Sequence, residues 1–254
     1  MLLAMDIGNT TISLGVMRGK KIIDLWHVYT AQTERQLISD LQKVLAGIKK
    51  RRYLIRDIII CSVVPRALGI VKPFLQKRMG IKVFVVGQDI KVPIKNNYRY
   101  PKQVGQDRLV GAYAAKVLYG APLIVVDFGT AITFDIVSKK GEYLGGIIVP
   151  GIRLTAESLF KKTALLPKVE IERPKELIGR DTKNSILSGI FYGYGSLCDG
   201  LIILINKKLK LKSTVIATGG YVNMMKQFSR EIGHVDQGLI FRGLYLIYQK
   251  GKES

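Results

Sequence analysis

Cysteine and histidine are scarce in this sequence, which contains two of each. Cys61 and Cys198 lie in apolar segments and form no Cys-x-x-Cys pair, so neither a disulfide scaffold nor a zinc site is expected. His27 and His234 are far apart, which disfavours a histidine-based metal site and a Ser-His-Asp hydrolase. The simplest interpretation is two buried structural thiols in a reducing, cytoplasmic compartment.

The sequence also lacks low-complexity linkers and long uninterrupted apolar runs. No such run approaches the roughly 18 residues of a membrane helix, and the first residues lead straight into Asp6 without a basic segment. We therefore expect neither a membrane span nor a secretory signal. Apolar residues make up 48% of the 254 residues, enough for a sizeable core in one large domain or two closely packed halves.

Acidic residues are few, since 19 Asp and Glu stand against 40 Lys and Arg, a formal net charge of +21. Such a charge attracts anions, including nucleotides and nucleic acid. The basic residues are nevertheless spread along the chain in short clusters such as Lys49–Arg52, without an aromatic-interleaved basic stripe. Specific nucleic-acid binding is therefore the less favoured interpretation.

Strand patterns alternate with helix patterns in two similar series. The first half reads as a β-meander over 1–29, a helix over 33–50, strands over 56–64 and 81–87, and a helix over 105–120. The second half reads as strands over 122–137 and 141–151, helices at about 152–165 and 184–208, a strand over 213–220, a helix after Gly220 and a last helix within 236–249. This order predicts an α/β protein with an internal duplication, with halves at 1–119 and 120–254.

The segment Asp6-Ile7-Gly8-Asn9-Thr10 follows an apolar strand. Gly8 permits a tight turn, and the backbone N–H groups, the Asn9 amide and the hydroxyls of Thr10 and Thr11 form a cluster of donors suited to an anion. Ionised Asp6 can only accept, so beside phosphates it makes sense as a ligand of hydrated magnesium, often through water.

Asp127-Phe128-Gly129-Thr130 repeats these parts about 120 residues later. One copy would be ordinary hairpin chemistry. Two copies at corresponding places in two halves predict a clamp around a triphosphate and its metal.

The segment Val104-Gly105-Gln106-Asp107-Arg108 offers the parts needed at a phosphoryl acceptor. Asp107 can accept the proton of an attacking hydroxyl, and Arg108 can bind a carboxylate through two hydrogen bonds. An aspartate is also favourable at a helix N-terminus for dipole reasons alone, so the residues leave both interpretations open.

Five motifs together, DIGNT, VGQDR, DFGTAIT, GGIIVPG and GRDT, resemble those of type III pantothenate kinases in order and spacing, over essentially the whole chain. That family belongs to the acetate and sugar kinase/Hsp70/actin superfamily of duplicated ribonuclease H-like folds. The resemblance implies ATP-dependent phosphorylation of pantothenate to 4'-phosphopantothenate, the first step of coenzyme A biosynthesis. It also implies a homodimer, for which the helix around 186–204 is a candidate interface, although a buried core helix fits equally well.

For pantothenate, the resemblance implies Asp107 as general base and a pocket lined by Gly105, Gln106, Asp107 and Arg108. It also implies a substrate-contacting tyrosine, Tyr98, with Tyr100 as the near alternative, and a substrate-contacting threonine, Thr182. The Asp-Thr pair at 181–182 fits a helix N-cap as well.

For ATP, the resemblance implies one contiguous segment around the phosphates and Thr130 on the opposite side. The segment comprises Asp6, Ile7, Gly8, Asn9, Thr10, Thr11, Ile12 and Ser13. A monovalent cation, potassium or ammonium, is implied near Asp127. The residues alone agree that a cation is sensible there, but they do not decide between a monovalent ion and magnesium.

Two alternatives remain from the sequence: a non-catalytic, nucleic-acid-associated transcription accessory protein of the same family, and a superfamily kinase for another small alcohol. The intact acid set of Asp6, Asp107 and Asp127 favours an enzyme, because a protein that has lost catalysis need not keep it.

Overall fold

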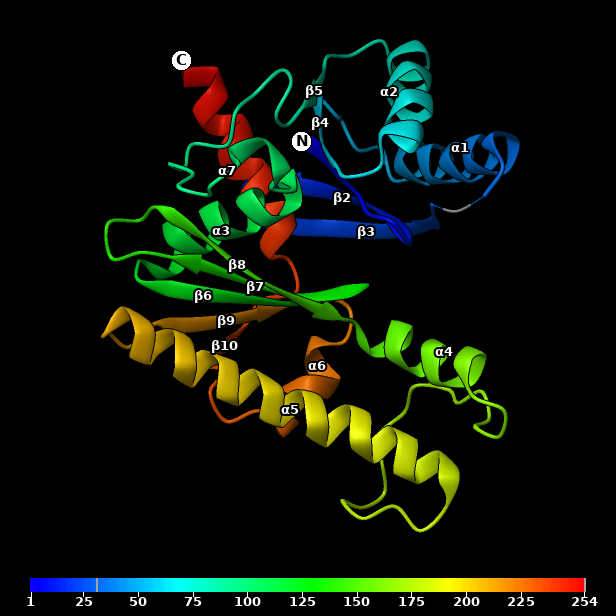
Figure 1. The fold of residues 1–254 in the computed structure, drawn as a ribbon. Helices are drawn as coiled ribbons and strands as arrows, with labels where there is room; N and C mark the ends of the chain where they lie inside the picture. Colours follow the sequence, from blue (N-terminus) through cyan, green and yellow to red (C-terminus); the bar gives the residue numbers. More distant parts are fainter. Residues whose placement is uncertain (31, 254) are drawn as a thin grey trace. The chain divides into compact units, whose positions relative to one another are not determined.

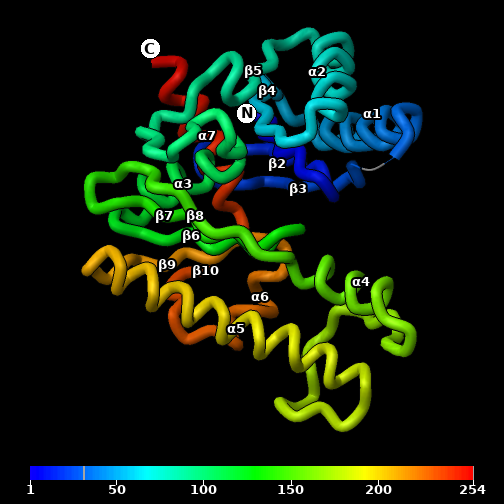
Figure 2. Tube along the Cα trace, viewed as in Figure 1, coloured from blue at the N-terminus to red at the C-terminus, as the bar shows by residue number. Residues whose placement is uncertain are grey.

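The computed structural model describes residues 1–30 and 32–253 (Figure 1). The chain forms two compact units, and Figure 2 follows their path from the blue N-terminus to the red C-terminus. The first unit comprises Met1–Lys95, Arg99–Ala114 and Gly238–Ser254, and the second comprises Asn96–Tyr98 and Ala115–Gln237. Each unit is described by itself below.

The first unit is built on a five-stranded sheet in the order β3-β2-β1-β4-β5. The meander is antiparallel and β4 and β5 run parallel to β1. The strands are β1 (Leu2–Ile7), β2 (Thr11–Arg18), β3 (Lys21–Tyr29), β4 (Asp57–Ser62) and β5 (Val83–Val85). All five correspond to strands that the sequence pattern predicts.

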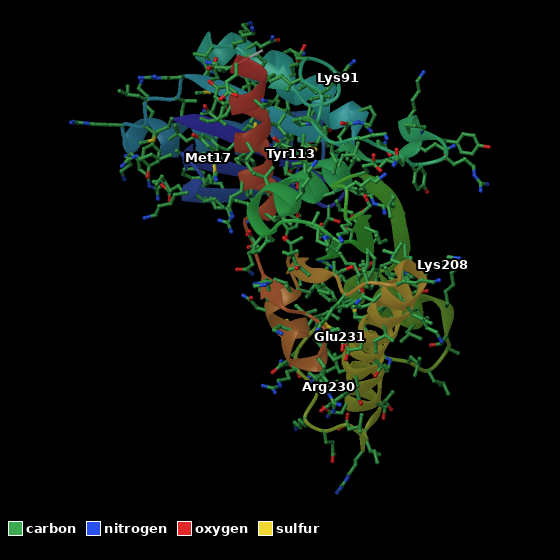
Figure 3. The ribbon with its side chains drawn as sticks, turned by 90° about the vertical axis from the view of Figure 1, so that its left-hand side faces the viewer. Met17, Lys91, Tyr113, Lys208, Arg230 and Glu231 are labelled. Carbon is green, nitrogen blue, oxygen red and sulfur yellow. The ribbon has the colours of Figure 1, made fainter. Side chains whose placement is uncertain are left out.

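Helices cover both faces of this sheet. One face packs against α1 (Glu34–Lys50) and α2 (Pro65–Met79), and the other against the first part of α3 (Gln106–Tyr119) and against α7 (Leu239–Glu253). Met17 and Tyr113, labelled in Figure 3, belong to the second of these cores. A short 3-10 helix, Pro101–Gln103, precedes α3.

The ends of α1 and α2 follow from local chemistry. Thr33 and Gln36 form a reciprocal capping box at the start of α1, which matches the predicted helix. Pro65, which the sequence pattern identifies only as the stop of a strand, is also the first residue of α2. A proline fits there because the first helical N–H needs no partner within the helix.

The second unit repeats the design of the first. Its five-stranded sheet has the order β10-β9-β6-β7-β8, which is the first sheet's order read from its parallel edge. The strands are β6 (Leu123–Phe128), β7 (Ala131–Val137), β8 (Tyr143–Pro150), β9 (Thr214–Thr218) and β10 (His234–Val235). The burial patterns of β1 and β6 are identical, with a half-buried aspartate at the fifth position of each. The predicted duplicated α/β fold is confirmed.

The helices of the second unit pack on one face of its sheet. They are α4 (Ile152–Lys162), α5 (Thr182–Leu209), α6 (Val222–Met225) and a 3-10 turn, Lys226–Phe228. The core between them and the sheet is formed by apolar side chains that include Phe128, Phe134 and Phe191. On α5, the Asp199 carboxylate accepts hydrogen bonds from the backbone N–H groups of Arg230 and Glu231, which Figure 3 labels.

Among the described helices, α5 is the one that is long and apolar enough to cross a membrane. The sequence pattern gave no such segment, because glycines and polar residues interrupt every apolar run. One side of α5, including Leu187, Phe191 and Cys198, is buried in the core of the second unit. Core helices of globular domains share this length and composition.

The compact units do not follow the predicted halves at their C-terminal end. Helix α7 packs against β1, β2 and β4 and belongs to the first unit, although it lies within 120–254. The boundary at 119/120 therefore stays a prediction about the duplication, and does not describe how the chain is divided into compact units.

Candidate active site

The first Asp-x-Gly turn is a tight connection between β1 and β2. The Gly8 N–H donates to the carbonyl of Thr11 at 3.0 Å. Thr30 holds the turn from outside, since its hydroxyl donates to the Gly8 carbonyl at 2.7 Å and its N–H donates to the Thr10 carbonyl at 3.0 Å. Asn9 and Thr10 are exposed at the tip. The turn is therefore a fixed frame whose side-chain donors reach solvent.

The side chains of the predicted phosphate-binding segment, residues 6–13, are not all accessible to a ligand. Ile7 and Ile12 are fully buried in the core of the first unit, so only their backbone groups can contact a ligand. The hydroxyl of Ser13 lies 3.0 Å from Nδ1 of His27, its partner across the β2–β3 pairing. The accessible donors are thus concentrated at the turn itself.

Two carboxylates of the first unit lie near one buried thiol. Cys61 on β4 is the register partner of Asp6 on β1, and it has no exposed surface. Burial raises the pKa of the Cys61 thiol far above its usual range, and the negative charges of Asp6 and Asp107 raise it further. The fold therefore brings the end of β1 and the start of α3 to the same place.

Asp107 lies in the first turn of α3, as the sequence predicts. Burial raises the pKa of this carboxyl group, against the opposing effects of the Arg108 N–H, which donates to Asp107 Oδ1 at 2.8 Å, and of the Arg108 charge. A carboxylate with a raised pKa holds a proton more readily than an ordinary aspartate, which suits a general base.

The residues around Asp107 explain the local sequence. A Cβ atom on Gly105 would overlap the Asp107 carboxylate, so a larger residue there would displace that carboxylate. The Gln106 side chain lies against Gly87, where it is engaged in packing. Of the four predicted pocket residues, only Asp107 and Arg108 carry charged side chains, and the charge of Arg108 acts on the Asp107 carboxyl group.

The second Asp-x-Gly turn is crowded by backbone from two other loops. A Cβ atom on Gly219, which has φ +96°, would overlap the Asp127 carboxylate and the backbone of Phe128. A Cβ atom on Gly151 would overlap the backbone of Thr130, whose carbonyl accepts from the Gly151 N–H at 3.1 Å. The Gly219 backbone therefore lies close to the half-buried Asp127 carboxylate, while the Thr130 side chain is exposed.

The two candidate tyrosines differ in their surroundings. Segment Asn96–Tyr98 lies beside β8, and the Tyr98 ring lies against Gly145, where a Cβ atom would come within 3.1 Å of the ring. Tyr100, in contrast, is 60% exposed. Of the two, Tyr98 is the residue with a fixed position.

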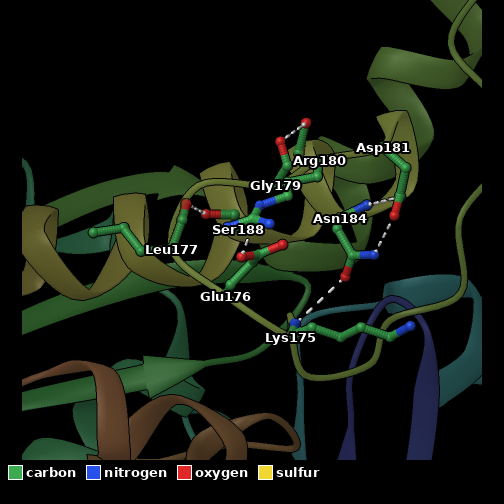
Figure 4. A network of polar contacts seen from close by, with 9 residues as sticks. Lys175, Glu176, Leu177, Gly179, Arg180, Asp181, Asn184 and Ser188 are labelled. Carbon is green, nitrogen blue, oxygen red and sulfur yellow. Dashed lines mark hydrogen bonds and ion pairs between the residues drawn. The ribbon is translucent and has the colours of Figure 1, made fainter.

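Thr182 is exposed at the first position of α5, next to its N-cap. The N-cap carboxylate, that of Asp181, accepts from the Asn184 backbone N–H at 2.8 Å and from the Asn184 amide at 2.7 Å (Figure 4). The Asn184 amide oxygen in turn accepts from the Lys175 N–H at 3.4 Å. The network fixes the entry into α5, so Asp181 has the capping role that the sequence allowed.

The described residues contain no group of three or more His, Cys, Asp or Glu side chains able to hold a metal ion by themselves. Magnesium does not need one, because it keeps several waters and takes one or two carboxylates together with phosphate oxygens. A half-buried carboxylate at the end of β1, beside an exposed donor turn, fits that requirement.

Sequence reasoning expected a buried thiol at Cys61, which is confirmed, but it did not place that thiol beside Asp6, and it gave Gly219 no definite role. Aligning the two halves would have placed Cys61 beside Asp6, since Cys61 corresponds to Thr218 in the second sheet. Gly219 follows that threonine, and its positive φ is the reason for glycine.

Two five-stranded sheets of the same strand order, each with an Asp-x-Gly turn after its central strand, give the chain the duplicated α/β fold of the actin-like ATPase class. The solved structures agree with this fold. A Campylobacter jejuni protein assigned to the Baf family of transcriptional activators has a TM-score of 0.60 at 20% identity, covering 99% of this chain and 100% of its own. The activator of 2-hydroxyisocaproyl-CoA dehydratase from Clostridium difficile has a TM-score of 0.56 at 12% identity, covering 99% and 96%. At these identities the likeness shows the fold alone.

The family model described as type III pantothenate kinase matches residues 2–203. The type III pantothenate kinase of Geotalea daltonii is 41% identical over 259 residues, with 100% of both chains covered. The chain therefore belongs to the type III pantothenate kinase family and is a kinase of coenzyme A biosynthesis. The predicted family membership and enzyme class are confirmed.

Proposed function

We propose that this chain transfers the γ-phosphoryl group of ATP to the primary hydroxyl of pantothenate, with Asp107 as the general base. The observation that carries the residue assignment is the position of Asp107: a carboxylate with a burial-raised pKa near the same buried thiol as Asp6. Family membership supports the reaction.

The chemical step is an in-line displacement. The pantothenate hydroxyl oxygen forms a bond to the γ-phosphorus while the bond from that phosphorus to the β,γ-bridging oxygen breaks, and ADP leaves. The hydroxyl proton passes to a carboxylate oxygen of Asp107. Because the transition state is loose and its charge is spread over phosphate oxygens, most of the rate enhancement must come from positioning and from donors aimed at those oxygens.

The phosphate contacts are assigned to the two turns. In the first, the backbone around Gly8 and the side chains of Asn9, Thr10 and Thr11 supply donors. Asp6, Ile7, Ile12 and Ser13 complete the segment, the two isoleucines through their backbone. In the second, the exposed Thr130 supplies a hydroxyl.

Two carboxylates are assigned to cations. Asp6 would hold magnesium, through water, and a bound magnesium ion would neutralise charge on the phosphates. Asp127 would hold a monovalent cation, potassium or ammonium. The close approach of the Gly219 and Phe128 backbone supports this assignment, because it sets the half-buried carboxylate beside peptide groups.

The pantothenate contacts are assigned to groups of matching chemistry. Arg108 would bind the pantothenate carboxylate, and Gly105, Gln106, Tyr98 and Thr182 would line the pocket. The fixed ring of Tyr98 and the exposed hydroxyl of Thr182 support these two positions.

We further infer a cytoplasmic homodimer. The apolar residues that α5 leaves exposed support a contact between copies: Ile203 is 54% exposed and Leu204 is 61% exposed. Size-exclusion chromatography with light scattering tests this, and a monomer at working concentrations would contradict it.

A turnover assay tests the function. Purified protein is supplied with ATP, magnesium and pantothenate, with and without potassium, and 4'-phosphopantothenate is measured by mass spectrometry. We expect product that depends on pantothenate and on potassium. Turnover of other small primary alcohols but not of pantothenate would contradict the substrate, and tight, salt-dependent DNA binding without any turnover would contradict the enzyme.

A further inference from the structure

A buried carboxylate in the second unit has no part in the proposed chemical step. Asp135 lies in the middle of β7, between the core residues Phe134 and Ile136, and only 3% of it is exposed. Burying a carboxylate is unfavourable unless hydrogen bonds compensate for its lost hydration. Here the Tyr143 hydroxyl donates to Asp135 Oδ1 at 2.7 Å and the Thr133 hydroxyl donates to Asp135 Oδ2 at 3.1 Å.

The first sheet has no carboxylate at the position that corresponds to Asp135. Asp6 pairs with Ser13 in the first sheet as Asp127 pairs with Thr133 in the second, so Gly15 in the first unit corresponds to Asp135. A Cβ atom on Gly15 would overlap the ring of Phe241. The two copies therefore use this position differently, and a carboxylate is present only in the second.

The partner of Asp135 connects it to the segment that carries Tyr98. Tyr143 has no exposed surface, and its carbonyl accepts from the Asn97 N–H at 2.9 Å. The neighbouring residue adds a second tie, because the Asn97 amide donates to Glu142 Oε2 at 2.9 Å. Tyr143 is thus held at its hydroxyl by Asp135, while its backbone holds Asn97.

The last link reaches Tyr98 itself. The backbone of Tyr98 is fixed by a hydrogen bond, since its N–H donates to Asn96 Oδ1 at 3.0 Å. The Tyr98 ring lies against Gly145, two residues beyond Tyr143. Gly145 has φ +128°, a conformation that glycine favours.

We propose that Asp135 and Tyr143 are positioning residues for pantothenate, because they fix the strand edge on which segment 96–98 and the Tyr98 ring rest. The inference rests on the proposed function for its link to pantothenate. Asp135 acts through Tyr143 and not on the substrate. Thr133, the other donor to Asp135, is the register partner of Asp127, so the same carboxylate also ties the Tyr98 edge to the strand beside the second turn.

The decisive variant is Tyr143→Phe, which removes one hydroxyl and keeps the ring in the core. Tyr248→Phe is the matched control, because Tyr248 is a buried tyrosine that donates to Asp57 within the first unit, whereas segment 96–98 belongs to the second. Asp135→Asn keeps an acceptor for Tyr143, and Asp135→Ala removes it.

The first measurement is hydrogen exchange of the 97 and 98 amides, which needs no kinase activity. We expect about tenfold faster exchange in Tyr143→Phe and Asp135→Ala, because a hydrogen bond to a charged acceptor contributes enough free energy for roughly that factor. Asp135→Asn should fall between these variants and the wild type, and Tyr248→Phe should leave both amides unchanged. Unchanged exchange in Tyr143→Phe would overturn the proposal, whether or not the protein phosphorylates pantothenate.

The second measurement is steady-state kinetics. Tyr143→Phe should raise KM for pantothenate about tenfold while kcat and KM for ATP stay within about twofold, because the hydroxyl fixes a substrate-contacting segment and not the nucleotide turn. Equal increases in both KM values, or the same change in Tyr248→Phe, would mean a general structural role and would overturn the proposal.

Discussion

Asp6 and Cys61 are register partners across the parallel pairing of β1 and β4. The second sheet repeats the relationship, with Asp127 beside Thr218 across β6 and β9. In each copy, the aspartate comes one residue before the end of its strand, so its carboxylate stands at the base of the glycine turn. The duplication therefore supplied two carboxylates at equivalent strand positions, which the proposed mechanism assigns to different cations.

Asp6→Asn should weaken the response to magnesium. The amide keeps the shape of the side chain but loses the charge that attracts a hydrated divalent ion. We expect the magnesium concentration for half-maximal activity to rise about tenfold, in line with the loss of a charged ligand contact. Magnesium titrations of activity measure this, with Asp40→Asn as a surface control. An unchanged magnesium dependence would reassign the ion to other ligands.

Asp107→Asn should abolish most turnover without unfolding the protein. General-base catalysis contributes about 10²- to 10⁴-fold, and asparagine cannot accept the hydroxyl proton. We expect kcat to fall by at least about a hundredfold, with KM for ATP little changed. Single-turnover phosphate transfer checks the chemical step directly. Near-normal turnover would show that another group takes the proton.

The pH dependence of Asp107 gives two linked expectations. Because burial raises its pKa, activity should decline with falling pH at a higher pH than an ordinary aspartate would give. The effect on stability is opposite to that of a carboxylate paired with a positive charge. Because the pKa of Asp107 is higher in the folded state than in the unfolded state, the ionised group opposes folding at neutral pH. Protonation removes this unfavourable contribution as the pH falls. Asp107→Asn should therefore raise the free energy of unfolding at neutral pH, by an amount that shrinks toward acid pH. Urea denaturation at several pH values measures it, and a variant less stable at neutral pH would refute the expectation.

Gly219→Ala should damage the second turn, and Gly220→Ala should not. A methyl group at 219 meets the Asp127 carboxylate and the Phe128 backbone and is also strained by the positive φ, whereas nothing lies within 4 Å of a Cβ atom at 220. We expect Gly219→Ala to raise the potassium concentration for half-maximal activity and to lower the melting temperature. Potassium titrations and thermal melts of the adjacent pair check this. Similar behaviour of both variants would mean that the turn tolerates displacement.

Lys252→Met should destabilise the protein at neutral pH but not in acid. Burial by itself raises the pKa of Asp57, but the bonds from Lys252 and Tyr248 outweigh it and lower the pKa overall. A lowered folded pKa gives stability that is present above the unfolded pKa and is lost as pH falls through the folded one. Lys252 is half exposed and its attraction to Asp57 is screened by water, so we expect a small loss of stability at pH 7. Chemical denaturation measures it, and Lys250→Met, which removes an exposed pair with Glu253, should cost less.

Much of the fold could be predicted because its signals are local. The helix over 33–50 could be predicted because its capping residues and the helical spacing of its apolar residues are both visible in the sequence. The turns of the β-meander are likewise marked by glycines. The sequence pattern did not predict helix α2, because Pro65 was interpreted only as the stop of a strand and is also the first residue of that helix. For the candidate site, the two Asp-x-Gly turns and the position of Asp107 at a helix start could be predicted, whereas the surroundings of that carboxylate could not.

The sequence by itself determined the strands, the repeated turn and the charged groups offered beside it, because these depend on residue type and on spacings of a few positions. Only the tertiary structure decided that Cys61 lies near both Asp6 and Asp107, that α7 completes the first unit, and that the buried Asp135 is connected through Tyr143 to segment 96–98. The physical reason is that strand pairing and side-chain packing join residues far apart in the chain. Burial and neighbouring charge, which set the protonation of these groups, exist only once that packing is complete.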